Sequence, residues 1–230
     1  MRRLFLRQVR SVRKRYVRMR YGSRPFVCRY LGADFRVSAD TGIASEIAYR
    51  SYERDRIENL LRLLRQARPR VFFDIGANCG VYTCIMLRNA VARQAIALEP
   101  DSRNLAALRD NIHLNGLEAS CQIIGAAAGR APAKVHLLHG PPGNLGQSRI
   151  VTERADEVID VVRIDDINEV RQHVIAAKFD VEGFEVEALA GAADTLSRNT
   201  GVVQVETYDH RAEVFRLMFG QVLLAQLNIQ

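Results

Sequence analysis

Short apolar runs and stretches of helical spacing alternate along most of the 230-residue chain. The runs have the near-continuous apolar character of strands buried on both faces, whereas the stretches between them repeat their apolar residues every three or four positions. This alternation predicts an α/β fold with a doubly wound, mostly parallel sheet and helices on both faces. Strands are expected at 71–74, 95–98, 122–125, 134–138, 158–164, 176–180, 201–206 and 221–229.

The helical stretches are marked most clearly at 102–115. Ser102 is a good residue to cap the start of a helix, and Gly116 is a good residue to follow its end. The stretch 45–66 is predicted to be one amphipathic helix, and a small strand or hairpin is expected at 26–37. Because a single strand follows the helix predicted at 211–219, we expect the C-terminal end of the sheet to be curtailed. Further helices are expected at 81–87 and 186–197.

The segment 71–80 carries the strongest functional signal. Its apolar run ends in Asp74, and turns of small residues follow at Gly76 and Gly80. Such a turn lets backbone N–H groups approach a ligand closely, ahead of a helix N-terminus that favours negative charge. A dinucleotide fingerprint would require glycine where this chain has Asn78. Since Asp74 suits a positive amino group better than a pyrophosphate, the turn predicts an amino-acid-bearing nucleotide such as S-adenosylmethionine.

A second acidic residue ends the next strand. The run 95–98 leads into Glu99 and Pro100, and a carboxylate at this place can accept hydrogen bonds from both ribose hydroxyls. A glycine turn alone also occurs in ordinary connections between a strand and a helix, but the two motifs in this order are far more specific. We therefore assign cofactor binding to Asp74, Gly76, Ala77, Asn78, Gly80, Glu99 and Pro100.

Five blocks of sequence together point to a family. They read FDIGANCG at 73–80, LEPD at 98–101, NIHLN at 111–115, KFDVEGFE at 178–185 and LAGA at 189–192. In this order they resemble the FkbM family of S-adenosylmethionine-dependent methyltransferases, from about Tyr52 to Glu206. The resemblance implies a class I methyltransferase domain of Rossmann-like fold. It also implies methyl transfer to hydroxyl oxygens of sugars, glycans or other natural products, and leaves the acceptor open.

The candidates for proton transfer are Asp180, Glu182 and His210. They lie at or after the ends of the predicted strands 176–180 and 201–206, which should meet at one crevice. A group of this kind can remove the proton of an acceptor hydroxyl. The alternative is that Glu182 merely complements a helix start and that His210 has no chemical role. Converging carboxylates could attract a divalent cation, but we predict no metal site.

The positive charge of the chain is concentrated at its beginning. The formal net charge is +7, yet residues 1–24 hold ten Lys or Arg and no acid. The rest of the chain has 23 basic and 26 acidic residues and is slightly acidic. We therefore divide the chain into a basic N-terminal arm at 1–24 and a single methyltransferase domain at 25–230, with the cofactor-binding core at 71–206.

The arm has an apolar stripe on one helical face, formed by Phe5, Val9, Val12, Tyr16 and Met19. A basic amphipathic helix can lie on an anionic membrane, bind nucleic acid or serve as a cleaved targeting peptide. It can also simply pack its stripe on the domain. Membrane contact and packing rank equally, and nucleic acid ranks behind them because no RNA-binding motif accompanies the arginines.

The remaining features bear on the cellular location of the protein and on its kind of function. The four cysteines form no Cys-x-x-Cys pair and no metal-ligand spacing, which favours reduced thiols and a cytoplasmic protein. The arm leaves open a peripheral position at the inner membrane surface. An O-methyltransferase is the leading function. The alternatives are an RNA methyltransferase, which would explain the arm, and a non-catalytic cofactor-binding or membrane-tethered scaffold.

Overall fold

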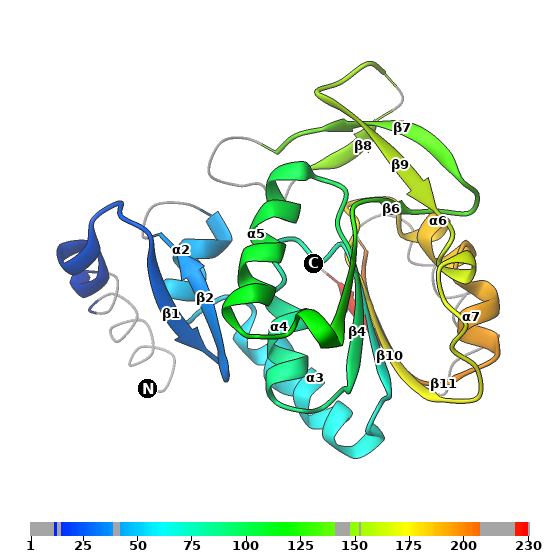
Figure 1. Cartoon of the computed structure of the whole chain (residues 1–230), viewed down its shortest axis with the longest axis horizontal. Helices are drawn as coiled ribbons and strands as arrows, with labels where there is room; N and C mark the ends of the chain where they lie inside the picture. The colour runs from blue at the N-terminus through cyan, green and yellow to red at the C-terminus, as the bar shows by residue number, and fades with distance from the viewer. Residues whose placement is uncertain are drawn as a thin grey trace.

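A six-stranded parallel sheet forms the centre of the protein (Figure 1). The computed structural model describes residues 12, 15–38, 42–140, 148–151, 153–207 and 224–229. Within them the strand order is β12-β11-β10-β3-β4-β5, and each neighbouring pair is parallel. The predicted parallel α/β fold is thus confirmed. The strands are β3 (Val71–Ile75), β4 (Gln94–Leu98), β5 (Cys121–Ile124), β10 (Val174–Phe179), β11 (Thr200–Thr207) and β12 (Leu224–Ile229).

The strand order reverses between β3 and β10. From β3 the chain builds outward through β4 to β5, and it then returns to the other side of β3 to add β10, β11 and β12. At such a reversal the connections leave the sheet in opposite directions, which opens a crevice at the carboxyl ends of the strands.

Helices cover both faces of this sheet (Figure 1). Strand β3 shows why, because Phe72 packs into the core of one face and Phe73 into the core of the other. One face is covered by α3 (Arg54–Ala67), α4 (Val81–Arg88) and α5 (Ser102–Leu114), and the opposite face by α6 (Glu185–Ala190) and α7 (Ala193–Ser197).

The prediction of one continuous helix at 45–66 is wrong. Two helices occupy the segment, α2 (Gly42–Ala48) and α3, and the apolar face of each is buried, with Ile47 in α2 and Ile57, Leu60, Leu61 and Leu64 in α3. Arg50 and Glu53 adopt the left-handed conformation, with φ of 58° and 37°, and this breaks the helix. The Tyr30 hydroxyl donates to the Tyr52 carbonyl at 2.6 Å inside the break. The break therefore depends on a contact with a distant strand.

The helix predicted at 186–197 is also two helices, α6 and α7, separated at Gly191. A Cβ atom at Gly191 would lie 2.0 Å from the carbonyl oxygen of Gly129, so the two chain segments touch backbone to backbone. The Gly191 carbonyl accepts a hydrogen bond from the Asp165 N–H at 3.0 Å rather than from a residue of the same helix.

The N-cap of α5 also differs from the prediction. Its side-chain cap is Asp101, which accepts the Arg103 N–H, and not Ser102.

A second sheet, of order β6-β9-β7-β8, contributes to the wall of the crevice. The strands predicted at 134–138 and 158–164 belong to this sheet and not to the parallel one. No helix was predicted between them, and an antiparallel pair needs only a loop. Its strands are β6 (Ala127–Ala128), β7 (Ala133–Leu138), β8 (Arg149–Val151) and β9 (Glu157–Val162). Outside the sheets, two short 3₁₀ helices are η1 (Glu118–Ser120) and η3 (Ile164–Asp166).

The N-terminal end of the described chain packs beside this core, whereas its C-terminal end, β12, is an edge strand of the central sheet. Near the N-terminus a helix at 15–21 leads to the expected hairpin, β1 (Phe26–Tyr30) and β2 (Ala33–Val37). Near the C-terminus β12 lies within the strand predicted at 221–229 and runs parallel to β11. The helix predicted at 211–219 falls outside the described residues. None of the helices in the described ranges combines the length and the apolar character that a membrane crossing requires.

Candidate active site

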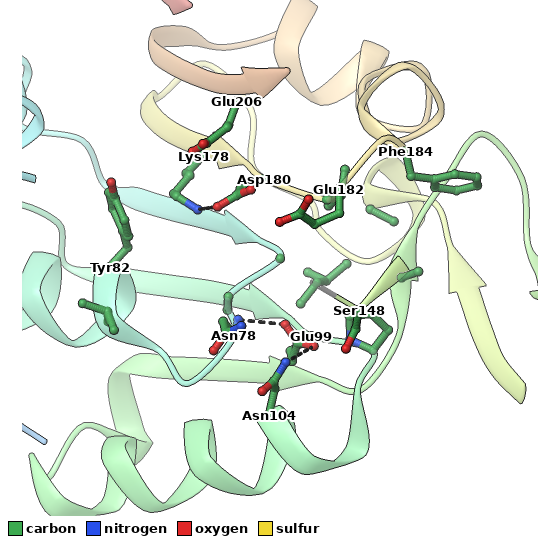
Figure 2. Close-up of a pocket in the computed structure, with 18 of the residues that line it drawn as sticks. Asn78, Tyr82, Glu99, Asn104, Ser148, Lys178, Asp180, Glu182, Phe184 and Glu206 are labelled. Carbon is green, nitrogen blue, oxygen red and sulfur yellow. Dashed lines mark hydrogen bonds and ion pairs between the residues drawn. The ribbon is translucent and has the colours of Figure 1, made fainter. Parts of the chain in front are cut away.

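A cavity of about 240 Å³ opens at the strand-order reversal, where the carboxyl ends of β3, β4, β10 and β11 meet. Figure 2 shows its two opposed walls, with Asn78, Glu99 and Asn104 on one and Asp180, Glu182 and Glu206 on the other. This is the place where doubly wound sheets bind ligands.

The glycine turn after β3 forms part of the first wall, the one that contains Asn78, Glu99 and Asn104. The Gly76 and Ala77 N–H groups donate to the Leu98 carbonyl at 3.0 and 2.9 Å, so the turn is tied to the end of β4. Gly76 has a φ of 81°, and a Cβ atom there would lie 1.9 Å from the Asp180 carbonyl oxygen. Glycine is therefore required at this position by both the conformation and the neighbouring chain. Asn78, at a φ of 52°, continues the tight turn toward α4.

Glu99 is the buried carboxylate of this wall. It is 5% exposed and accepts hydrogen bonds from the backbone N–H groups of Asn78 at 2.7 Å and Asp101 at 2.9 Å. The Asn104 amide lies 3.5 Å from the same carboxylate. Burial raises the pKa of Glu99 to about 7, although the hydrogen bonds from Asp101, Asn78 and Asn104 oppose the shift. A carboxylate fixed in this way offers its remaining lone pairs to the cavity.

Asp74 lies beneath the turn and does not line the cavity. It is 1% exposed, and its Oδ2 accepts the backbone N–H of Thr83 at 3.0 Å and the hydroxyl of Thr83 at 2.5 Å. Burial raises the pKa of Asp74, while the charge of Lys178 and the bonds from Thr83 lower it. The geometry thus gives Asp74 the task of joining the end of β3 to the first turn of α4. Gly80 is likewise outside the lining and packs against Leu108.

The opposite wall contains an ion pair between a buried lysine and a partly exposed aspartate. The Lys178 Nζ lies 2.7 Å from Asp180 Oδ2 and 4.7 Å from the centre of the Tyr82 ring, and Lys178 is only 3% exposed. Burial alone would lower the pKa of Lys178, but the charges of Asp180 and Asp74 reverse this effect and raise it. The ammonium is therefore held in its charged form, and it balances the charge of Asp180.

Glu182 points into the cavity beside this pair (Figure 2). Its φ of 48° lies in the left-handed region, where non-glycine residues are uncommon. Burial raises the pKa of Glu182 to about 7, and the charges of Asp180 and Glu206 add to the shift. A carboxylate with this pKa is half ionised near neutral pH and can accept a proton from a substrate.

A chain of charged and aromatic side chains supports the same wall from α3 and α4. The Tyr82 hydroxyl donates to Glu53 at 2.6 Å, and Arg56 Nη1 donates to both oxygens of Glu206 at 3.0 Å. Arg56 also lies 3.8 Å from Glu53. Because the break between α2 and α3 turns Glu53 inward, these contacts connect the N-terminal helices to the carboxyl end of β11.

The cavity thus collects most of the residues expected from the sequence. Asp74 and Gly80 lie behind it, and His210 falls outside the described residues. Lys178 and Tyr82 were not singled out. Lys178 could have been found from its position two residues before Asp180, which places both on one side of a strand. The expected residues that line the cavity are Gly76, Ala77, Asn78, Glu99, Pro100, Asp180 and Glu182.

A group of potential metal ligands lies beside the cavity, formed by Asp101, His139 and Glu157. Asp101 already accepts a two-pronged ion pair from Arg103, with 2.8 Å between Nη2 and Oδ2, and its Oδ2 also accepts the Ser148 hydroxyl at 2.6 Å. A bound metal would have to displace this fixed guanidinium. The group instead connects the start of α5 to β9 through Glu157 and to the end of β7 through His139.

The lining fits an amino-acid-bearing nucleoside. The turn at Gly76 brings its backbone to the cavity without a side chain, and Glu99 supplies a carboxylate for hydroxyl groups. Five carboxylates and one ammonium line the cavity among the described residues, which matches a ligand of positive charge. The carboxylates are Glu53, Glu99, Asp180, Glu182 and Glu206.

Comparison with solved structures finds several methyltransferases that are similar over part of the chain. Among solved structures, an FkbM methyltransferase from Methylobacillus flagellatus is 23% identical, with a TM-score of 0.43, and the match covers 56% of this chain and 30% of that one. An S-adenosylmethionine-dependent methyltransferase from Agrobacterium tumefaciens is 17% identical, with a TM-score of 0.35 and coverage of 45% and 32%. A tRNA m1G37 methyltransferase from M. jannaschii is 18% identical, with a TM-score of 0.31 and coverage of 45% and 29%.

The chain therefore spans about a third of the length of each of these proteins. No curated protein matches it. A sequence model of the FkbM methyltransferase domain matches residues 74–226, which is more than half of the chain and includes both walls of the cavity. The chain belongs to the FkbM methyltransferase family.

Proposed function

We propose that this protein is an S-adenosylmethionine-dependent O-methyltransferase that acts on a hydroxyl group of a neutral sugar, glycan or other natural product. The observation that carries this proposal is the pair of opposed walls, with Glu99 beside the glycine turn and Glu182 facing it across one cavity. Bound S-adenosylmethionine supplies an electrophilic methyl group, so the protein has to hold the acceptor in line and remove one proton.

The first wall binds the nucleoside in this proposal. Glu99 accepts hydrogen bonds from the ribose hydroxyls, while Gly76, which has no side chain, lets the nucleoside approach the turn closely. Glu99 can do this because its bonds to Asn78 and Asp101 fix its orientation beforehand. Asp74 stabilises the turn from below, through Thr83.

The second wall binds and deprotonates the acceptor. Glu182 would accept the proton of the acceptor hydroxyl, and bound S-adenosylmethionine would supply the methyl group to that oxygen and leave as S-adenosylhomocysteine. Asp180 is less suited to this step because Lys178 neutralises it at 2.7 Å. We assign Asp180 to orientation of the acceptor and of Glu182.

The acidic lining of the cavity also argues against RNA as the methyl acceptor. A ribose-phosphate backbone brings negative charge, and Lys178, the one basic side chain among the described lining residues, is already paired with Asp180 and offers that charge no partner. Neutral polyhydroxylated acceptors carry donors for these same carboxylates. The cavity therefore favours the neutral acceptor.

The experiment is to measure formation of S-adenosylhomocysteine with panels of neutral sugars and of RNA. Glu182→Gln is expected to lower kcat by about 10²-fold or more while the affinity for S-adenosylhomocysteine stays unchanged. Glu187→Gln is the matched control, because Glu187 is a partly exposed residue of α6 bound to Arg130 outside the cavity. Preferred turnover of RNA, or a kcat that is insensitive to Glu182→Gln, would overturn the proposal.

A further inference from the structure

The described helix at 15–21 has apolar side chains on two faces. Val17 is 3% exposed and belongs to the core, and Tyr21 stacks on Phe26 with 3.9 Å between ring centres. Tyr16 and Met19, in contrast, are 56% and 80% exposed. One face thus attaches the helix to the domain, and the other remains in contact with solvent.

Val12 continues the exposed face. It is helical, 70% exposed, and precedes Tyr16 and Met19 by four and seven positions, which places the three side chains in one row. We call this row the outer stripe. The expectation that the stripe packs on the domain is therefore wrong for these three residues, because the domain takes Val17 instead.

Arginines border the outer stripe. In a helix of about 3.6 residues per turn, Arg15 falls on one side of the stripe and Arg20 on the other, and both are exposed. The helix itself carries no acid, since the first acidic residue of the chain is Asp34. Figure 1 shows this helix beside β1 at one end of the long axis of the molecule.

We propose that the outer stripe docks on an anionic phospholipid bilayer. Val12, Tyr16 and Met19 would enter the boundary between headgroups and acyl chains, while the arginines meet the phosphates on either side. Apolar side chains flanked by cations match a surface that is apolar beneath and anionic above. Nucleic acid would pair with the arginines but would leave the stripe in water, and a second copy of this chain would bring its own arginines against them.

The experiment is sedimentation of the full chain with vesicles. Binding is expected to vesicles of phosphatidylcholine with phosphatidylglycerol and to be weak with phosphatidylcholine alone. Replacing the stripe (V12S, Y16S, M19S) is expected to lower binding by about tenfold or more, as is replacing its border (R15Q, R20Q). Val158→Ser is the matched control, because Val158 is 57% exposed on β9 and should leave binding unchanged.

The folding of each variant is checked by its affinity for S-adenosylhomocysteine and by its circular dichroism spectrum. If S-adenosylhomocysteine is not bound by any form, the spectrum alone serves, so that the membrane proposal is judged separately from the enzymatic one. Three results would overturn the proposal. These are absence of vesicle binding, vesicle binding that survives loss of the stripe, and concentration-dependent dimerisation that the stripe variant abolishes. RNA binding that depends on the arginines but not on the stripe would likewise contradict it.

Discussion

Glu99 Oε2 accepts the backbone N–H of Asn78 at 2.7 Å, and this hydrogen bond joins the carboxyl ends of β3 and β4 at the cavity. The two motifs that stand 21 residues apart in the chain thereby become one binding surface. The same carboxylate also accepts the Asp101 N–H, so both of its oxygens hold backbone in place. Cofactor affinity should therefore depend on Glu99 both directly and through the shape of the turn.

The first prediction concerns Glu99→Gln. Glutamine has one acceptor oxygen, so it cannot accept from Asn78 and Asp101 together or offer a charge to the ribose hydroxyls. The affinity for S-adenosylhomocysteine, measured by calorimetric titration, should fall by about 10- to 100-fold, or roughly 1.4–2.7 kcal/mol. Glu118→Gln is the control, because Glu118 is an exposed residue paired with His113. Equal affinities of the wild type and the Glu99 variant would contradict the assignment.

The second prediction concerns stability as a function of pH. Burial raises the pKa of Glu99 from 4.5 to about 7, so the folded protein binds more protons than the unfolded chain between these values. The stabilisation is complete below pH 4.5 and is lost as the pH rises through 7. For Glu99 the loss amounts to at most about 3 kcal/mol. Thermal unfolding of the ligand-free protein from pH 5 to 8 should show a falling Tm.

The Glu99→Gln variant tests the source of this pH dependence. Glutamine does not titrate, so its Tm should fall less steeply over the same range. Glu182 also has a pKa raised to about 7 by burial and by Asp180, and it should account for a remaining part of the slope. A Tm that rises with pH in the wild type would show that neither carboxyl group is protonated in the folded state.

The third prediction concerns the pH profile of turnover. If Glu182 is the base, kcat/KM should rise tenfold per pH unit below about 7 and level off above it, since the ionised carboxylate accepts the proton. Glu182→Gln should remove the rise together with most of the activity. Initial rates at saturating cofactor give the profile. A rise that persists in Glu182→Gln would place the titrating group elsewhere.

The fourth prediction concerns Gly76→Ala. A methyl group at Gly76 would lie 1.9 Å from the Asp180 carbonyl oxygen, and backbone atoms cannot move aside cheaply. Unfolding by urea should show a loss of about 3 kcal/mol or more, with loss of cofactor binding. Gly116→Ala is the matched control. Gly116 also has a positive φ, of 63°, but nothing lies within 4 Å of its Cβ position, so the cost should be only about 1–2 kcal/mol.

The fifth prediction concerns the ion pair of Lys178, which is buried, and Asp180, which is partly exposed to the cavity. Lys178→Met leaves the carboxylate of Asp180 without its ammonium partner and should cost about 1–3 kcal/mol of unfolding free energy. Adding Asp180→Asn to that variant should recover part of the loss, because the unpaired charge is removed. A double-mutant cycle by urea unfolding measures the coupling. Additive losses would mean that the two side chains do not interact in solution.

Several features followed from the amino-acid sequence alone. The mainly apolar runs at 71–74, 95–98, 176–180 and 201–206 identified the central strands, because strands buried on both faces are mostly apolar. Lys178 and Gln204 are buried polar exceptions within them. Parallel strands place their carboxyl ends at one edge, so the acidic residues that follow them could be expected to converge. Local composition was sufficient here because each of these properties depends on residues close together in the chain.

The tertiary structure decided what distant residues impose on one another. Gly191 interrupts a helical pattern because the Gly129 backbone passes 2.0 Å from where its Cβ would be, and no local signal reveals that approach. Asp74 was assigned to the ligand, and the structure adds that its Oδ2 accepts hydrogen bonds from Thr83 below the turn. The pKa of Glu182 near 7 and the balance of Asp180 by Lys178 likewise arise from burial and from charges on neighbouring strands. Hydrophobic periodicity reports which face of an element is buried, whereas contacts between elements depend on how the whole chain packs.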